Sequence, residues 1–306
     1  MTDPATPPAR RTRSRRSLLG AAAASALALP LANAPGATAA PSGGSAGGKQ
    51  LKTMSFNLRY ASDTPPNSWP ERRPVMRSLL REERPHVLGT QEGLYAQLRD
   101  IHTDLGARYD WLGTGRMGGS KDEFMAVFYD TGRLEPVEYD HYWLSDTPYT
   151  IASKSWGNEI VRMVTWIRFH DRSRGSDFYF INTHLDHQSQ PARERSAELI
   201  TSRFADLDAS LPRVVTGDFN VAAHKNPVYD TMLQAGGLLD TWDEAAKRSK
   251  LYGTFHGYKG LVPDGDRIDW ILATPGVSCS YSEINTYAEG GQFPSDHLPV
   301  QAVLEL

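Results

Sequence analysis

Short segments of alternating or continuous apolar residues, most of them ending in polar residues, recur along the chain and predict β-strands. They span residues 50–60, 86–93, 123–130, 161–170, 177–187, 213–220, 266–274 and 297–306. Other segments carry apolar residues at the spacing of a helix, and they span residues 72–85, 94–105, 191–207 and 226–236. Because helices are interspersed with strands, the pattern predicts an α/β fold.

The order of these segments indicates more than one sheet. Several strands follow one another without a helix between them, and residues 108–184 contain many strand-like segments and no good helix. Two mixed sheets packed face to face, with helices on the outside, would accommodate this order. The sequence shows no internal repeat and no second linker, so we expect one domain over residues 50–306.

Residues 1–39 have the layout of a secretory signal peptide, in which a basic segment precedes an Ala/Leu stretch and small residues. Arg15 and Arg16 stand directly before the apolar part, in SRRSLL, which resembles a twin-arginine export signal. A membrane anchor is the alternative, but Pro30 interrupts the stretch, which is shorter than the ~20 apolar residues of a span. We therefore expect a secreted, extracellular protein.

Signal cleavage is expected after Ala39, because a cut after Ala34 would leave proline directly behind the cleavage site. Residues 40–49 are rich in glycine, serine and alanine, which predicts a flexible leader. The folded part of the chain then begins near Lys49.

The charge balance argues against a general affinity for nucleic acid. The chain has 33 basic and 36 acidic residues, and residues 1–40 hold five arginines and one aspartate. Without that segment the chain has 28 basic and 35 acidic residues, a formal charge of −7. The sequence therefore lacks a global basic footprint, although a bound metal ion would supply local positive charge.

Polar residues follow or interrupt the strand-like segments, and they are Asn57, Glu92, His184, Asp218, Asn220, Asp269, Asp296 and His297. Aspartate and asparagine favour caps and turns, which would explain any one of them. That explanation is poor for so many strand ends, and such groups cluster when their strands share a sheet and point the same way. Carboxylates and amides are hard oxygen ligands, which suit Mg²⁺, Mn²⁺ or Ca²⁺ better than zinc.

Signatures of several other enzyme classes are missing from the sequence. It contains no GxxxxGKS/T nucleotide loop, no HExxH zinc motif and no GxSxG serine-hydrolase motif. Magnesium held by one or two carboxylates is the usual partner of substrate phosphates. These observations favour a site in which water attacks a phosphate ester.

Six motifs then occur in a fixed order, and they are MSFNLRY, GTQEG, INTHLDH, TGDFN, DRIDWIL and SDHLPV. In this order they resemble the endonuclease/exonuclease/phosphatase superfamily, which has the deoxyribonuclease I-like fold. The similarity covers residues 51–306, and PPNSWPERRPVMRSLL with GTQEGLYAQLRDI resembles a bacterial, mostly exported branch. The resemblance implies a four-layer α/β/β/α sandwich and metal-dependent cleavage of phosphoester bonds.

The resemblance also implies roles for individual residues. Glu92 corresponds to the principal metal ligand, with Asn57 beside it, and Asp296 to a second metal-site carboxylate. Asp218 corresponds to the carboxylate that orients and deprotonates the attacking water. Asn220 would hold that water or a phosphate oxygen.

Two histidines are expected at the phosphate by the same resemblance. His297 corresponds to the one that contacts the scissile phosphate, with Asp269 as its hydrogen-bonding partner. His184 corresponds to the second histidine. In the deoxyribonuclease branch that second histidine pairs with a glutamate, and Glu123 lies on the corresponding strand.

Substrate contacts are expected from one strand and two loops. Arg162 resembles a phosphate-binding arginine. Thr254, Phe255 and His256 would line the pocket, with an ordinary turn and a packed phenylalanine as the equal alternative. Trp156 would stack on a base or a sugar near the mouth of the site, and core packing is its alternative.

Three functions fit these residues. The first is hydrolysis of a phosphodiester, for example a nucleic acid, with Mg²⁺ or with Mn²⁺ or Ca²⁺. The second is hydrolysis of a phosphomonoester on a sugar, an inositol or a lipid. The third, a catalytically inactive binding module, would require the loss of motif residues that are all present. We expect a monomer without a stable protein partner.

Overall fold

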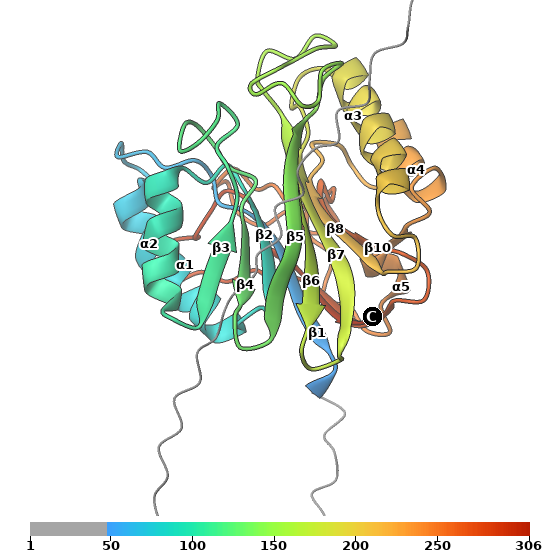
Figure 1. Ribbon diagram of the computed structural model, residues 1–306. Coiled ribbons are helices and arrows are strands. Elements are labelled where there is room, and N and C mark those ends of the chain that lie inside the picture. Colours follow the sequence, from blue (N-terminus) through green and yellow to red (C-terminus); the bar gives the residue numbers. More distant parts are fainter. Residues whose placement is uncertain (1–47) are drawn as a thin grey trace, which may run out of the picture.

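The structure is a computed structural model that describes residues 48–306 (Figure 1). The expected signal peptide lies outside the described residues, and so does all of the expected leader except residues 48 and 49. Within residues 48–306, no helix has the length and apolar character needed to cross a bilayer.

The first sheet has six strands and is mixed. Strands β1 and β2 are parallel, and the other neighbouring pairs are antiparallel. From edge to edge its strands are β11 (Ser278–Ile284), β12 (Val300–Glu305), β1 (Leu51–Asn57), β2 (Val87–Gln91), β4 (Val127–Asp130) and β3 (Tyr109–Leu112).

The second sheet is also mixed and six-stranded, and here β7 and β8 form the parallel pair. From edge to edge its strands are β5 (Leu134–Trp143), β6 (Met163–Asp171), β7 (Ser176–His184), β8 (Arg213–Asp218), β10 (Asp269–Ala273) and β9 (Leu239–Asp240). Apolar residues of both sheets fill the space between them, among them Val87, Phe180, Val214, Ile271 and Leu304.

Helices cover the outer face of each sheet (Figure 1). On the first sheet α1 (Trp69–Glu83) and α2 (Tyr95–Leu105) pack through Leu79, Leu80, Leu98 and Ile101. On the second sheet α3 (Gln190–Arg203), the 3₁₀ turn η2 (Phe204–Asp206) and α4 (Pro227–Gln234) pack through a separate core cluster. The short helix α5 (Thr241–Glu244) lies against β10 and β11. The predicted four-layer α/β/β/α sandwich is confirmed.

Helix α1 begins three residues earlier than the apolar pattern predicts. Ser68 N and Ser68 Oγ both donate to Glu71 Oε2, at 2.8 and 2.9 Å, which caps the helix before its first apolar turn. Helix α3 begins in a similar way, with Ser189 Oγ accepting from Ala192 N at 3.3 Å.

The strand register brings the expected site residues to one edge of the sandwich. Asn57 on β1 is paired with Gln91 on β2, the residue before Glu92. In the second sheet Asp218 is paired with His184 on one side and Asp269 on the other. Strands β1 and β2 pack on β7 and β8, so the polar ends of both sheets face one another.

Candidate active site

Asn57 joins carboxylates from the two sheets. Its buried side chain donates from Nδ2 to Glu92 Oε1 at 2.9 Å and to Asp218 Oδ2 at 3.0 Å. The Asn57 Oδ1 atom accepts from Arg59 N at 2.9 Å. Because a backbone N–H only donates, this contact fixes the orientation of the amide. One amide therefore holds two carboxylates that lie 126 positions apart in the chain.

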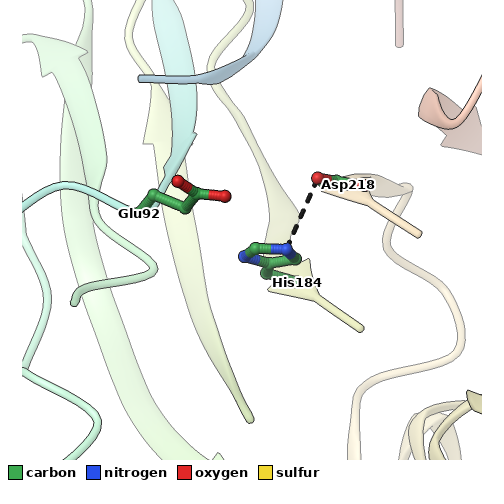
Figure 2. Close-up of side chains that lie close together, drawn as sticks. All are labelled: Glu92, His184 and Asp218. Atoms are coloured by element: carbon green, nitrogen blue, oxygen red, sulfur yellow. Dashed lines mark ion pairs between the residues drawn. The ribbon is translucent and has the colours of Figure 1, made fainter. Parts of the chain in front are cut away.

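Glu92, His184 and Asp218 converge on one point (Figure 2). Glu92 directly follows β2 with a backbone φ of 63°, a left-handed conformation that is uncommon for a residue other than glycine. Its Oε2 accepts from Tyr60 N at 3.0 Å. One potential ligand atom from each of the three side chains lies within 4.8 Å of the others.

His184 is neutral and its Nε2 carries no proton. Asn220 Nδ2 donates to Leu185 O at 3.1 Å and lies 3.0 Å from His184 Nε2. Because a carbonyl only accepts, the atom facing it is the amide nitrogen, and Nε2 must accept from the same NH₂ group. Burial is the main cause that lowers the pKa of His184 well below its ordinary value, and nearby Arg162 adds to it.

This protonation state leaves acceptors facing acceptors. His184 Nε2 lies 3.4 Å from Asp218 Oδ2, and neither atom brings a proton to that contact. The Glu92 carboxylate adds a third acceptor within reach. A divalent cation would resolve such an arrangement through the carboxylates of Glu92 and Asp218, which suit Mg²⁺ or Mn²⁺, whereas the lone pair of His184 Nε2 is already taken by Asn220. The residues therefore fit a metal ion.

Asp296, the other expected metal-site carboxylate, lies at the edge of this cluster. Its side chain is 20% exposed, and its Oδ2 lies 3.9 Å from Arg59 Nε. Burial raises its pKa, and the negative charge of Glu92 raises it further. Among residues 48–306, Asp296 belongs to no cluster of three or more histidine, cysteine or acidic side chains whose potential ligand atoms lie within 4.8 Å of one another.

His297 and Asp269 form a buried dyad. His297 Nδ1 donates to Asp269 Oδ2 at 2.9 Å, and the side chains are only 7% and 1% exposed. Burial alone would lower the pKa of His297, but the carboxylates of Asp269 and Asp218 outweigh it and raise that pKa to about 10. The ring therefore carries a positive charge at neutral pH.

Asp218 lies between the two imidazoles. Its Oδ2 is 3.4 Å from His184 Nε2 and 3.7 Å from His297 Nε2, and its Oδ1 accepts from Asn220 N at 2.9 Å. Burial raises the pKa of Asp218, and the neighbouring Asp269 carboxylate raises it further. A carboxylate with a raised pKa is a stronger base, which suits proton abstraction from water.

The expected pairing of Glu123 with His184 is wrong. Glu123 instead accepts two hydrogen bonds from Arg116, at 2.7 and 2.9 Å. Arg116 N also donates to Glu123 O, so the hairpin between them brings the two side chains together. His184 Nδ1 has no hydrogen-bond partner within residues 48–306. Burial raises the pKa of Glu123 to about 7, against the opposing charge of Arg116.

Arg162 is a buried cation beside the site. Its side chain is 3% exposed, and its Nη2 lies 3.2 Å from His187 Nδ1. The Nε atom is 3.9 Å from Asp186 Oδ2, and neither Nε nor Nη1 has a hydrogen-bond partner in the described part of the chain. Because Glu123 and Asp218 both stabilise its charge, the guanidinium lies within their electrostatic reach.

The segment from Thr254 to His256 lies against His297, with different roles for its residues. Thr254 is fully buried, and its Oγ1 accepts from Ile268 N and Asp269 N at 2.9 and 3.2 Å. Its hydroxyl therefore supports the start of β10 and does not line a pocket, which corrects the expectation. Phe255 is 51% exposed, with its ring centroid 5.0 Å from that of His297.

His256 is buried beside this aromatic residue. Its Nδ1 accepts from Tyr258 N at 3.2 Å, and its ring lies tilted against that of Phe293, with the ring centroids 4.5 Å apart. Burial lowers its pKa to about 4. Only Phe255 of the three expected pocket residues therefore presents a large exposed surface next to the dyad.

Trp156 is only partly buried, in the loop before β6. Its Nε1 donates to Asp146 Oδ1 at 2.8 Å, and Arg195 lies over its ring at 5.7 Å. Its backbone oxygen accepts from Ser189 Oγ at 3.2 Å. The ring is fixed by these contacts, and no contact with the Glu92 cluster accompanies them.

Several residues near the site carried no expectation from sequence. They are Arg59, Arg116, Asp186 and His187. Three of them stand inside or next to quoted motifs, since MSFNLRY contains Arg59 and INTHLDH contains Asp186 and His187. Their position in those motifs could have marked these three residues as part of the site. Arg116 had no such signal, because its hairpin shows no strand or helix periodicity.

Residues 54–297 match the sequence model of the endonuclease/exonuclease/phosphatase family. A search among curated proteins found no match.

Solved structures with the same fold include three from Bacteroides. An endonuclease/exonuclease/phosphatase from Bacteroides vulgatus is 32% identical, with a TM-score of 0.79 over 84% of this chain and 99% of its own. An endonuclease/exonuclease/phosphatase family protein from Bacteroides thetaiotaomicron is 33% identical, with a TM-score of 0.77 over 83% and 97% of the two chains. A mannosyl-6-phosphatase from the same organism is 32% identical, with a TM-score of 0.77 over 84% and 100%.

Proposed function

The chain belongs to the endonuclease/exonuclease/phosphatase family, and we propose that it is a divalent-metal-dependent phosphatase acting on a phosphomonoester of a sugar. The observation that carries this proposal is the convergence of Glu92, His184 and Asp218 within 4.8 Å of one another. The His297–Asp269 dyad adjoins this cluster through Asp218. Acidic, neutral and cationic groups are thus held together around one point.

The proposed reaction is in-line attack of water on the phosphorus atom. Asp218 accepts the proton of the water, and its raised pKa makes it a better base. Asn220 and neutral His184 border the position of the water. Held by the Glu92 carboxylate, a divalent cation would neutralise phosphate charge and polarise the bond to be broken.

The cationic groups would stabilise the phosphate. Cationic His297 donates from Nε2 to a phosphate oxygen or to the leaving group, and Asp269 holds the ring in that orientation. Arg162 offers its unused donors to the remaining oxygens. Phosphoryl transfer depends chiefly on such positioning and charge neutralisation.

We place a monoester ahead of the diester for two reasons. A phosphomonoester carries more negative charge than a diester, and buried Arg116 and Arg162 lie near the cluster together with charged His297. The mannosyl-6-phosphatase is 32% identical, and the match covers 100% of that protein and 84% of this chain. Exposed Phe255 beside His297 offers a flat apolar surface of the kind that a sugar ring covers.

A substrate panel tests the proposal. The purified protein is assayed with Mg²⁺, Mn²⁺ or Ca²⁺ on mannose 6-phosphate, p-nitrophenyl phosphate, bis-p-nitrophenyl phosphate and plasmid DNA. We expect turnover of the two monoesters and its loss with chelator. Turnover of only the diester and DNA would replace the proposed substrate class with a phosphodiester. Chelator-insensitive hydrolysis would remove the metal from the proposal.

Two substitutions test the assignment of the chemistry. Asp218→Ala and His297→Ala should each lower kcat by at least about 10²-fold, the usual effect of losing one group that acts on the transition state. Near-normal turnover by either folded variant would refute its role.

We also propose that the protein leaves the cell by the twin-arginine route. The paired arginines Arg15 and Arg16 ahead of the apolar stretch support this. Replacing both with lysine should retain the precursor in the cytoplasm, and cell fractionation measures this directly. Unchanged secretion would favour the general secretory pathway.

A further inference from the structure

A buried polar network lies between the two sheets beneath the candidate site. Most of the interface between the sheets is apolar, as Val87, Phe180 and Val214 illustrate. At the end nearest the site, however, Gln91 and Thr216 face one another across a third polar residue, Asn182. Each of these three side chains is 0% exposed.

Asn182 uses both ends of its carboxamide. Its Oδ1 accepts from Gln91 Nε2 at 2.7 Å and from Thr216 Oγ1 at 3.1 Å. Its Nδ2 donates to Thr90 O at 2.7 Å and to Ala126 O at 3.1 Å. Four hydrogen bonds therefore tie β7 to β8 in its own sheet and to the first sheet at β2 and just before β4.

The sheets also approach closely here. A Cβ atom added at Gly89 on β2 would lie 2.3 Å from Thr216 Oγ1 and 2.7 Å from Asn182 Oδ1. Any residue larger than glycine would force the side chains of Thr216 and Asn182 to move or the two sheets to separate at this level. The backbone of β2 thus rests directly on the polar side chains of the opposite sheet.

Each strand in the network carries a residue of the candidate site just beyond it. Gln91 is followed directly by Glu92. Asn182 and His184 lie two positions apart on β7, and residues two positions apart on a strand point to the same face. Thr216 and Asp218 have the same relation on β8. Wherever the network places the strands, it also places Glu92, His184 and Asp218.

We infer that Asn182 is a positioning residue that sets the register between the two sheets, so that Glu92 from one meets His184 and Asp218 from the other. Shape alone does not require an amide here, because leucine has the same branched outline and apolar pairs fill the rest of the interface. A fully hydrogen-bonded amide, unlike an apolar contact, accepts only one relative placement of its partners. The inference deepens the proposed function and rests on it for its catalytic readout.

The test uses matched substitutions at the edge of the network. Thr216→Val keeps the shape of the side chain and removes the donor to Asn182 Oδ1, whereas Thr216→Ser keeps the donor and removes a methyl group. Asn182→Leu removes all four hydrogen bonds. Val214→Ala, two residues before Thr216 on β8 and in the apolar part of the same interface, controls for loss of packing.

Mg²⁺ binding is measured by calorimetry and by the Mg²⁺-dependent rise of the melting temperature, and kcat and KM are measured on p-nitrophenyl phosphate. We expect Thr216→Val and Asn182→Leu to weaken Mg²⁺ binding or lower kcat by about 10–100-fold, the range found when groups that orient metal ligands are lost. KM should change much less. Thr216→Ser should keep the Mg²⁺ binding and the kcat of the parent protein. Val214→Ala should lower only the melting temperature.

The inference is overturned if Thr216→Val behaves as Val214→Ala does, with a lower melting temperature and unchanged Mg²⁺ binding and kcat. If Asn182→Leu does not fold, the Thr216 pair decides the matter alone. Calorimetry also separates this inference from the proposed function. Should the parent protein hydrolyse no phosphoester, weaker Mg²⁺ binding by Thr216→Val would still support the positioning role.

Discussion

Replacing Asp269 with asparagine should slow the reaction while preserving the fold. The substitution keeps the size of the side chain and removes the charge that faces His297 Nδ1 at 2.9 Å. The backbone at position 269 stays anchored, because its N–H donates to Thr254 Oγ1 at 3.2 Å. The perturbation is therefore confined to the support of the imidazolium ring.

The expected size of the effect follows from the burial of the pair. The two side chains are 7% and 1% exposed, so water does not replace the lost charge. A hydrogen bond to a charged group contributes about 1.5–3 kcal/mol. If that difference appears in the transition state, kcat falls by about 10- to 150-fold, since each 1.36 kcal/mol is tenfold. The loss should be greatest with substrates whose leaving group needs a proton.

The assay measures kcat on p-nitrophenyl phosphate and on mannose 6-phosphate at saturating Mg²⁺. Asp240→Asn is the matched control, because Asp240 is an equally buried carboxylate on the adjacent strand β9, paired with Arg267 at 2.7 Å. The control should lose stability and keep its kcat. Equal kcat for Asp269→Asn and the parent protein, with both folded, would refute the role of the dyad.

Three further outcomes are expected. Glu92→Gln should abolish the rise in melting temperature on adding Mg²⁺, seen by differential scanning fluorimetry, because it removes a carboxylate from the ligand cluster. Glu123→Gln should lower kcat less than about tenfold, since its hydrogen bonds go to Arg116 at 2.7 and 2.9 Å. Burial lowers the pKa of His86 from 6.5 to about 4, so the unfolded chain binds a proton that the folded protein does not, and stability falls as the pH drops through that window. Denaturant unfolding at pH 7.5 and 5 measures this fall in the free energy of unfolding, which should be smaller for His86→Asn than for the parent protein. Because the ring is partly solvated, the free energy should change by less than about 1.4 kcal/mol per pH unit in either protein.

The sequence predicted the layers and the convergence of polar strand ends for the same physical reason. Apolar runs that end in acids or amides mark strand ends, and parallel neighbours bring such ends together. Asn57 and Glu92 lie at the ends of the parallel strands β1 and β2, and Asp218 lies at the end of β8, which is parallel to β7. The distance of 161 positions between Asn57 and Asp218 disappears once the two sheets pack.

Other features depend on contacts that a one-dimensional pattern does not contain. The partner of Glu123 is set by a hairpin whose own backbone hydrogen bonds bring Arg116 opposite to it. The inward direction of the Thr254 hydroxyl is set by two amides at the start of β10. The sequence marks neither, because turns and irregular segments lack the periodicity that identifies strands and helices.

The two histidines of the site are chemically different although both are buried, and their neighbours explain why. His297 faces two carboxylates, whose charges outweigh burial and keep the ring protonated. His184 accepts at Nε2 from Asn220 and lies near Arg162, so burial and positive charge act in the same direction and keep it neutral. Asp218 lies between them, within 3.4 Å of an acceptor and 3.7 Å of a donor. In the proposed reaction, the attacking water is held at this carboxylate, which accepts its proton, and His297 donates a proton to the departing oxygen from the other side. The groups that surround each imidazole, and not burial alone, thus set the direction of proton transfer that the proposed reaction requires.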